Sequence, residues 1–244
     1  SPQVCGGFIL IENDFAGFHY PSVEDALLTL YSHEYAHAVG AAYAAGTSTW
    51  WDEGQATWAE HAFADIEHDV IRLASRWFAA PATALDDPTG PGGGWGYAGS
   101  TFILHLAAVH GDALVRETWE ALGAGSARTA VGALDFALQQ RGSSVQTEWD
   151  GFATAAWFTG TRAGFSSGTA IPFAGSLPEL SPRSIQIADL PYRHTSAKWS
   201  ADYVRFDGLV GRASTYAISP CTAEGPVQGV RMIEPMTHAV RALV

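Results

Sequence analysis

The chain has 244 residues, of which 47% are hydrophobic and only 16% are charged, and its formal net charge is −12 at pH 7. This charge argues against nucleic acid and anionic membrane surfaces as partners, because both would repel an acidic protein. No apolar run approaches the roughly 20 residues of a membrane span, so we expect a soluble globular protein with a sizeable core.

The N-terminal part is predicted to contain one short strand and two helices. Residues Phe8–Ile11 form a β-branched and aromatic run, which is typical of a strand. Ser22 is a predicted N-cap, with Asp25 in the reciprocal capping-box position, for a helix over residues 23–45. A second helix is expected over residues 52–64, where alanines supply its packing face.

The middle of the chain is predicted to be helical. Residues 86–96 form a loop rich in Pro and Gly, without the Gly-Lys-Ser/Thr ending of a phosphate-binding loop. Apolar residues at three-to-four spacing then predict helices over residues 98–110, 112–122, 127–141 and 145–158. Trp50, Trp51 and Trp58 are expected to pack in the core.

After Gly160 the composition shifts to Gly, Ser, Thr and Pro. Short alternating patterns predict strands over residues 185–187 and 203–206. The pattern as a whole predicts an α+β protein, with a mostly helical domain over residues 1–164 and a small β-rich segment or domain over residues 165–244.

The chain contains two cysteines, Cys5 and Cys221, near its opposite ends. They could form a disulfide in an oxidising compartment or stay as two buried free thiols. The start at Ser1-Pro2 has no signal-peptide pattern and is typical of a processed end. We therefore expect a secreted or extracellular protein.

Residues 33–37 read His-Glu-Tyr-Ala-His, an H-E-x-x-H motif in the middle of the first predicted helix. Residues four apart share a helix face, so His33 and His37 can bind one zinc ion. Glu34 lies too far around the helix to be a ligand, but it can accept a proton from a zinc-bound water. The alternative is an amphipathic helix whose histidines only pack.

A catalytic zinc site needs a third protein ligand and an open position. Glu53 begins the second predicted helix, and a helix–turn–helix of this length can bring its carboxylate back over both imidazoles. Glu60 follows two turns later on the same face, so it is predicted to accept the second N–H of a ligand histidine. Alternatively, Glu53 is an acid favoured at a helix N-terminus and Glu60 is a solvated helix residue.

The H-E-x-x-H motif, followed by a Trp-Trp-x-Glu-x-x-Ala-Thr-Trp segment, resembles the gluzincin metallopeptidases. These include the aminopeptidase N type and secreted bacterial proteases with this tryptophan-containing signature. The resemblance covers residues 5–160 and implies a zincin-like fold. It also implies that Zn²⁺ is bound by His33, His37 and Glu53, with Glu34 as the general base.

Tyr97 opens a segment similar to the Tyr-x-x-Gly segment of aminopeptidase-like gluzincins, although Gly99 stands one residue early. The resemblance implies that the Tyr97 hydroxyl stabilises the oxyanion of the reaction. The strand over Phe8–Ile11 occupies the place of the edge strand that hydrogen-bonds an extended substrate in such enzymes. The Gly-x-Met-Glu-Asn motif of aminopeptidases is absent, which favours an endopeptidase.

We therefore expect zinc-dependent hydrolysis of peptide bonds in a protein or peptide substrate. The competing hypothesis is a catalytically inactive zincin scaffold that acts as a surface protein- or glycan-binding module. Glu34 favours the enzyme, because an inactive site has no need of a general base.

Overall fold

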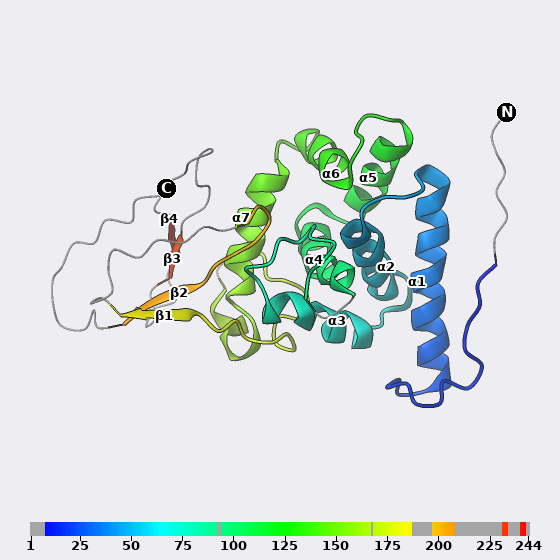
Figure 1. The fold of residues 1–244 in the computed structure, drawn as a ribbon, viewed down its shortest axis with the longest axis horizontal. Helices are drawn as coiled ribbons and strands as arrows, with labels where there is room; N and C mark the ends of the chain where they lie inside the picture. The colour runs from blue at the N-terminus through cyan, green and yellow to red at the C-terminus, as the bar shows by residue number, and fades with distance from the viewer. Residues whose placement is uncertain are drawn as a thin grey trace.

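The computed structural model describes residues 8–91, 94–166, 168–186, 197–207, 231–233 and 240–242, and most of them are helical (Figure 1). The α-helices are α1 (Val23–Tyr43), α2 (Thr49–Ala64), α3 (His68–Ala79), α4 (Gly99–His110), α5 (Ala113–Gly123), α6 (Ala130–Gln139) and α7 (Val145–Ala156). Two short 3-10 helices are η1 (Trp95–Ala98), which leads into α4, and η2 (Gly160–Phe165), which follows α7.

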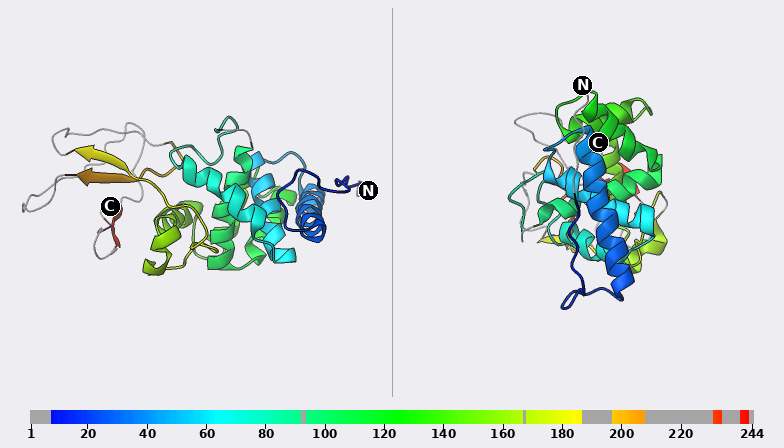
Figure 2. Two further views of the ribbon diagram at one scale, coloured as in Figure 1. Left: turned by 90° about the horizontal axis from the view of Figure 1, so that it is seen from below. Right: turned by 90° about the vertical axis from the view of Figure 1, so that its right-hand side faces the viewer.

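The strands that the structure describes are short and lie in the C-terminal part of the chain. β1 (Arg183–Gln186) pairs in parallel with β2 (Val204–Asp207). β3 (Arg231–Ile233) pairs antiparallel with β4 (Val240–Ala242). β1 and β2 extend from the end of the helical body opposite α1 (Figures 1 and 2). A mostly helical body with short strands agrees with the predicted α+β class.

Helix α1 begins where the sequence predicts. The Ser22 hydroxyl accepts a hydrogen bond from the Asp25 backbone N–H at 3.0 Å and donates one to the Asp25 carboxylate at 2.8 Å. Glu24 and Asp25 also place negative charge in the first turn, where the helix dipole favours it. The helix ends at Tyr43, slightly before the predicted end.

Two elements differ from the prediction. The strand expected over Phe8–Ile11 is wrong, because these residues pair with no strand among those described. They form an extended segment beside α1, in which Phe8 and Leu10 are exposed and the two isoleucines are half-buried. Helix α3 was not predicted, although its buried Val70, Leu73 and Trp77 follow helical spacing.

The core forms around α2 and α4, and the three tryptophans of α2 are buried in it as predicted. Gly54 of α2 lies against Gly99 of α4, and a Cβ at Gly54 would approach the Gly99 carbonyl carbon to 2.9 Å. Two glycines are therefore needed where these helices touch. Ile171, Leu177 and Leu180 from the segment after η2 also belong to this core.

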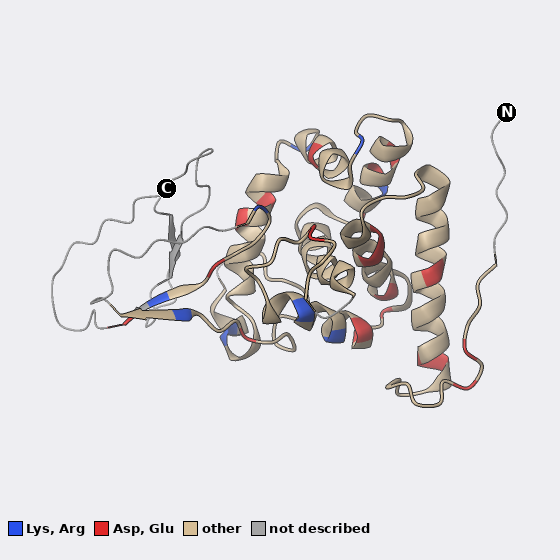
Figure 3. Ribbon diagram, in the orientation of Figure 1, with Lys and Arg blue, Asp and Glu red and all other residues tan. Residues whose placement is uncertain are grey.

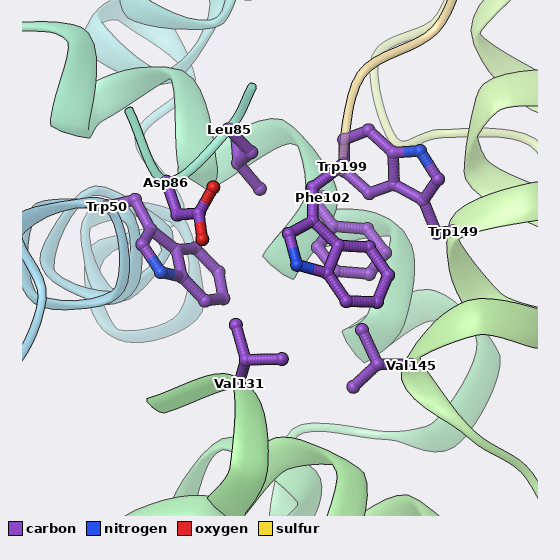
Figure 4. Close-up of a pocket in the computed structure, with 8 residues that line it drawn as sticks. All are labelled: Trp50, Leu85, Asp86, Phe102, Val131, Val145, Trp149 and Trp199. Carbon is purple, nitrogen blue, oxygen red and sulfur yellow. The ribbon is translucent and has the colours of Figure 1, made fainter. Parts of the chain in front are cut away.

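Residues 197–203, which precede β2, pack against the helices beside a small pocket lined largely by aromatic side chains (Figure 4). Trp199 packs there against Trp149, with ring centroids 6.2 Å apart. Its backbone carbonyl accepts a hydrogen bond from the Leu85 N–H at 2.9 Å. The Tyr203 hydroxyl donates to the Ala153 carbonyl at 2.6 Å. The chain around Trp199 is therefore fixed to the helices.

The two faces of α1 differ sharply. Its buried side chains, including His33 and Ala36, face the body of the protein, and the Gly40 backbone touches the Trp119 ring. Its opposite face carries large apolar side chains at every fourth position, which we call the outer stripe: Val23, Leu27, Tyr31, Tyr35, Val39 and Tyr43. Each of these side chains is exposed, and α1 lies at the edge of the molecule, with the extended N-terminal segment running alongside it (Figures 1 and 2).

Within the described residues, no single helix is long and apolar enough to cross a membrane. One pair of helices, Trp95–His110 and Ala113–Gly123, passes the length and composition criteria together but is bent by 110°. The α4 side chains of this pair are largely buried in the core.

Candidate metal centre

Helices α1 and α2 form a hairpin that brings the predicted ligands together. Its short connection includes Gly46, whose φ of +75° lies in the left-handed region that glycine adopts without strain. His33 is buried and His37 half-buried on the face of α1 that meets α2. Because α2 runs back along α1, Glu53 near the start of α2 returns to the level of both histidines.

Three side-chain atoms from these residues form a small triangle. The Nε2 atoms of His33 and His37 are 3.2 Å apart. Glu53 Oε2 lies 3.3 Å from the first and 3.6 Å from the second. An ion held tetrahedrally with bonds of roughly 2.0–2.1 Å would separate its ligand atoms by about 3.3 Å. The structure therefore contains a His-His-Glu group close enough to bind a metal ion.

The electrostatics of this triangle suit a cation. Glu53 Oε2 is buried beside two imidazole nitrogens but has no well-aligned hydrogen bond, a deficit that a bound metal ion would relieve. Burial alone would raise the pKa of Glu53, but hydrogen bonds and positive charge from His33 and His37 hold it well below its ordinary value. The carboxylate is therefore ionised and ready to ligate.

Each imidazole is held by a carboxylate on its other nitrogen. His33 Nδ1 lies 2.8 Å from Glu60 Oε1. Glu60 is therefore within hydrogen-bond distance of the ring nitrogen of His33 that faces away from the triangle. His37 Nδ1 lies 3.1 Å from Asp52 Oδ1. Asp52 was not predicted, although its position directly before Glu53 was a usable signal. In both rings the carboxylate contacts Nδ1, and Nε2 points towards the centre of the triangle. Metal-bound histidines are held in the same way, with one ring nitrogen on the metal and the other hydrogen-bonded to the protein.

These carboxylates change the proton affinity of the site. Burial lowers the pKa of His33, but Glu53 and Glu60 outweigh this effect and raise it to about 9. Hydrogen bonds to Asp52 and Glu53 raise the pKa of His37 to about 10. Burial raises the pKa of Glu60 to about 7, although His33 opposes the shift. Metal binding must therefore displace protons from the two imidazoles.

A polar cluster centred on the carboxylate of Asp69 lies at the start of α3. The Tyr20 hydroxyl donates to Asp69 Oδ2 at 2.9 Å, and Arg72 Nε donates to Asp69 Oδ1 at 3.0 Å. The charges of Asp69 and Arg72 both influence the pKa of Glu60. The start of α3 thus lies within electrostatic reach of the carboxylate that contacts His33, a link that the sequence did not reveal.

Tyr97 lies beside the triangle, on η1 rather than on α4. Gly96 allows this approach, because a Cβ there would lie 2.7 Å from Thr49 Cγ2 at the start of α2. The Tyr97 and His33 rings stack with centroids 5.8 Å apart and planes 27° apart. Burial, followed by the charge of Glu53, raises the pKa of Tyr97 to about 12. Its hydroxyl is therefore a hydrogen-bond donor at neutral pH.

Glu34 is exposed on α1, next to His33 in sequence. Its charge contributes to the raised pKa of Tyr97, so the two side chains are within electrostatic reach of each other. The structure thus brings His33, His37, Glu53, Glu60 and Tyr97 to one region, with Glu60 on its buried side. Glu34 lies next to His33 on the same helix, with its side chain exposed.

Among the described residues, no other group of three His, Cys, Asp or Glu side chains has the spacing for a metal ion. Cys5 and Cys221, for which a disulfide and two free thiols were both open, lie outside the described residues. Comparisons of the chain with protein-family models, with curated proteins and with solved structures found no match. A function for this chain therefore rests on its own residues and their geometry.

Proposed function

We propose that this protein is a zinc-dependent peptidase with a zincin-like active site. The observation that supports it most is the triangle of His33, His37 and Glu53, whose atom separations of 3.2, 3.3 and 3.6 Å fit one tetrahedral ion. Two imidazoles and a carboxylate leave a fourth position open, as in catalytic zinc sites rather than structural ones.

The protein would hold the ion with these three residues, and the bound ion would supply a Lewis acid and lower the pKa of a water molecule. Glu34 would take the proton from that water, a role supported by its position directly after His33 on α1 and by its exposed side chain. The same carboxylate would then deliver the proton to the leaving amine, acting first as base and then as acid.

Tyr97 would stabilise the oxyanion that develops on the scissile carbonyl. Its raised pKa of about 12 keeps the hydroxyl protonated, and its stacking on His33 holds the ring at the edge of the triangle. A positioned donor of this kind contributes about 3 kcal/mol to transition-state stabilisation in enzymes with comparable oxyanion sites.

The test compares Glu34→Gln with Glu24→Gln, a matched change at an exposed carboxylate in the first turn of the same helix. We expect Glu34→Gln to keep its zinc, measured by elemental analysis, and to cleave a fluorogenic peptide library at least about 100-fold more slowly. Glu24→Gln and wild type should cleave at similar rates, and a chelator should abolish both activities.

Two results would overturn the proposal. Wild-type protein that binds no zinc would remove the metal centre, and chelator-resistant cleavage would show that another site is responsible. Zinc-loaded wild-type protein that cleaves no peptide in the library would instead support the inactive-scaffold hypothesis.

A further inference from the structure

The two histidines of the triangle are held in different surroundings. The side chains of His33 and its partner Glu60 are 8% and 2% exposed, so this pair is enclosed by the protein. The side chains of His37 and its partner Asp52 are 24% and 41% exposed. One imidazole is therefore fixed inside the core, whereas the other depends on a contact at the surface.

We propose that Asp52 is the positioning residue for His37 and sets how tightly the centre holds its metal. The inference rests on the proposed metal centre. Asp52 Oδ1 is the acceptor that the structure places 3.1 Å from His37 Nδ1. A proton on Nδ1 leaves the lone pair of Nε2 directed at the triangle, and the hydrogen bond fixes the plane of the ring.

The backbone around Asp52 is rigid enough for this role. Its N–H donates to the Ser48 carbonyl at 3.1 Å, and its own carbonyl accepts from Gln55 Nε2 at 3.2 Å. The next residue is the ligand Glu53. The N-terminal part of α2 thus carries Asp52 and Glu53 side by side, and both carboxylates face His37.

His33 and His37 do not share this support. Of the two imidazoles, Glu60 contacts only that of His33. Glu60 lies in the buried part of α2, two turns beyond Glu53. Loss of Asp52 would therefore free the more exposed imidazole to rotate while His33 and Glu53 stay in place. The expected consequence is weaker metal binding in a protein that is still folded.

The experiment compares Asp52→Ala, Asp52→Asn and the control Glu24→Ala, which removes an exposed first-turn carboxylate from α1. Zinc affinity is measured by competition with a chromogenic chelator. We expect Asp52→Ala to weaken zinc binding by about 10- to 100-fold, the usual effect of losing such a partner. Asp52→Asn keeps an acceptor oxygen and should stay within a few-fold of wild type, as should Glu24→Ala.

A second readout is independent of zinc. In 15N-histidine NMR spectra, the Nδ1 proton of His37 should be protected from solvent exchange in wild type and Asp52→Asn, and unprotected in Asp52→Ala. Equal zinc affinity in Asp52→Ala and wild type would overturn the inference. Equal weakening in the Ala and Asn variants would also overturn it, because charge alone would then be responsible.

If the proposed function fails, the experiment gives a different set of results from those expected if only the role of Asp52 is wrong. If wild-type protein binds no zinc, the metal centre is wrong, and the protection of the His37 ring proton still decides whether Asp52 holds this imidazole. Unchanged exchange in Asp52→Ala would overturn the Asp52 inference on its own. Melting temperatures of the metal-free variants confirm that each of them is folded.

Discussion

At the residue scale, the site combines two imidazoles with three carboxylates in a confined volume. Glu53, Glu60 and Asp52 each contact a ring nitrogen of His33 or His37 at 2.8 to 3.6 Å. Without a cation, protons on the imidazoles are what balances this negative charge. The same carboxylates therefore attract both protons and metal ions, and the two compete for the site.

This competition predicts a measurable release of protons. The pKa values of about 9 for His33 and about 10 for His37 mean that both rings carry an extra proton at pH 7 in the metal-free protein. Zinc binding at pH 7 should therefore release about two protons, measured by calorimetry in buffers of different ionisation enthalpy. The number should fall towards zero as pH rises past about 10, and zinc affinity should rise over the same interval. Binding at pH 7 without proton release would contradict these protonation states.

At the scale of elements, the α1–α2 hairpin brings the ligands together, and α4 holds α2 in place. Gly54 lies one residue after the ligand Glu53, at the contact between α2 and α4. A side chain there must push the two helices apart, because two of the three nearest atoms belong to the backbone at Gly99 and Ser100 and the third is Ile103 Cδ1.

Gly54→Ala should therefore destabilise the fold by about 1–3 kcal/mol, the usual cost of overpacking a core. The matched control is Gly151→Ala in α7, where the nearest atom to a new Cβ is His105 Nε2 at 3.6 Å. That change should be neutral or stabilising by up to about 1 kcal/mol, because alanine favours the helix. Chemical denaturation measures both, and equal effects would show that α2 and α4 do not meet as closely as described.

Local patterns in the sequence were sufficient for the hairpin and its ligands. Ser22 and Asp25 indicated the start of α1, and the spacing of His33 and His37 indicated that both imidazoles lie on one helix face. Such signals act over one or two helical turns, so they can be read without knowing the rest of the fold. The position of Glu53 followed from the length of the connection between the helices.

Elements that depend on distant partners were harder to predict. The run over Phe8–Ile11 has strand-like residues, but a strand also requires a neighbour to pair with, and the described residues supply none there. From its sequence position, Asp52 is an ordinary acidic residue in the first turn of a helix. Its contact with His37 depends on how α1 packs against α2. Helix α3 begins in a segment rich in Asp, Glu and His, which reads as a loop despite its buried apolar face.

At the scale of the whole molecule, charge and apolar surface are unevenly distributed. Arg72 is the first Lys or Arg in the chain, so α1 and α2 carry Asp and Glu residues but neither Lys nor Arg (Figure 3). The outer stripe of α1 runs along this acidic side, with Tyr31 and Tyr35 stacked at 5.9 Å. An exposed apolar row of this length favours association, whereas the surrounding negative charge opposes it.

This balance predicts that native protein binds a hydrophobic dye and self-associates more strongly as salt screens the repulsion. The double variant Leu27→Gln/Tyr31→Gln should reduce both effects in dye-fluorescence and light-scattering measurements. Its melting temperature should change little, because these side chains are 43% and 54% exposed in the folded protein. Phe136→Gln is the control, since Phe136 is 42% exposed on α6 and lies outside the stripe. A large loss of stability in the double variant would mean that the outer face of α1 is covered rather than open.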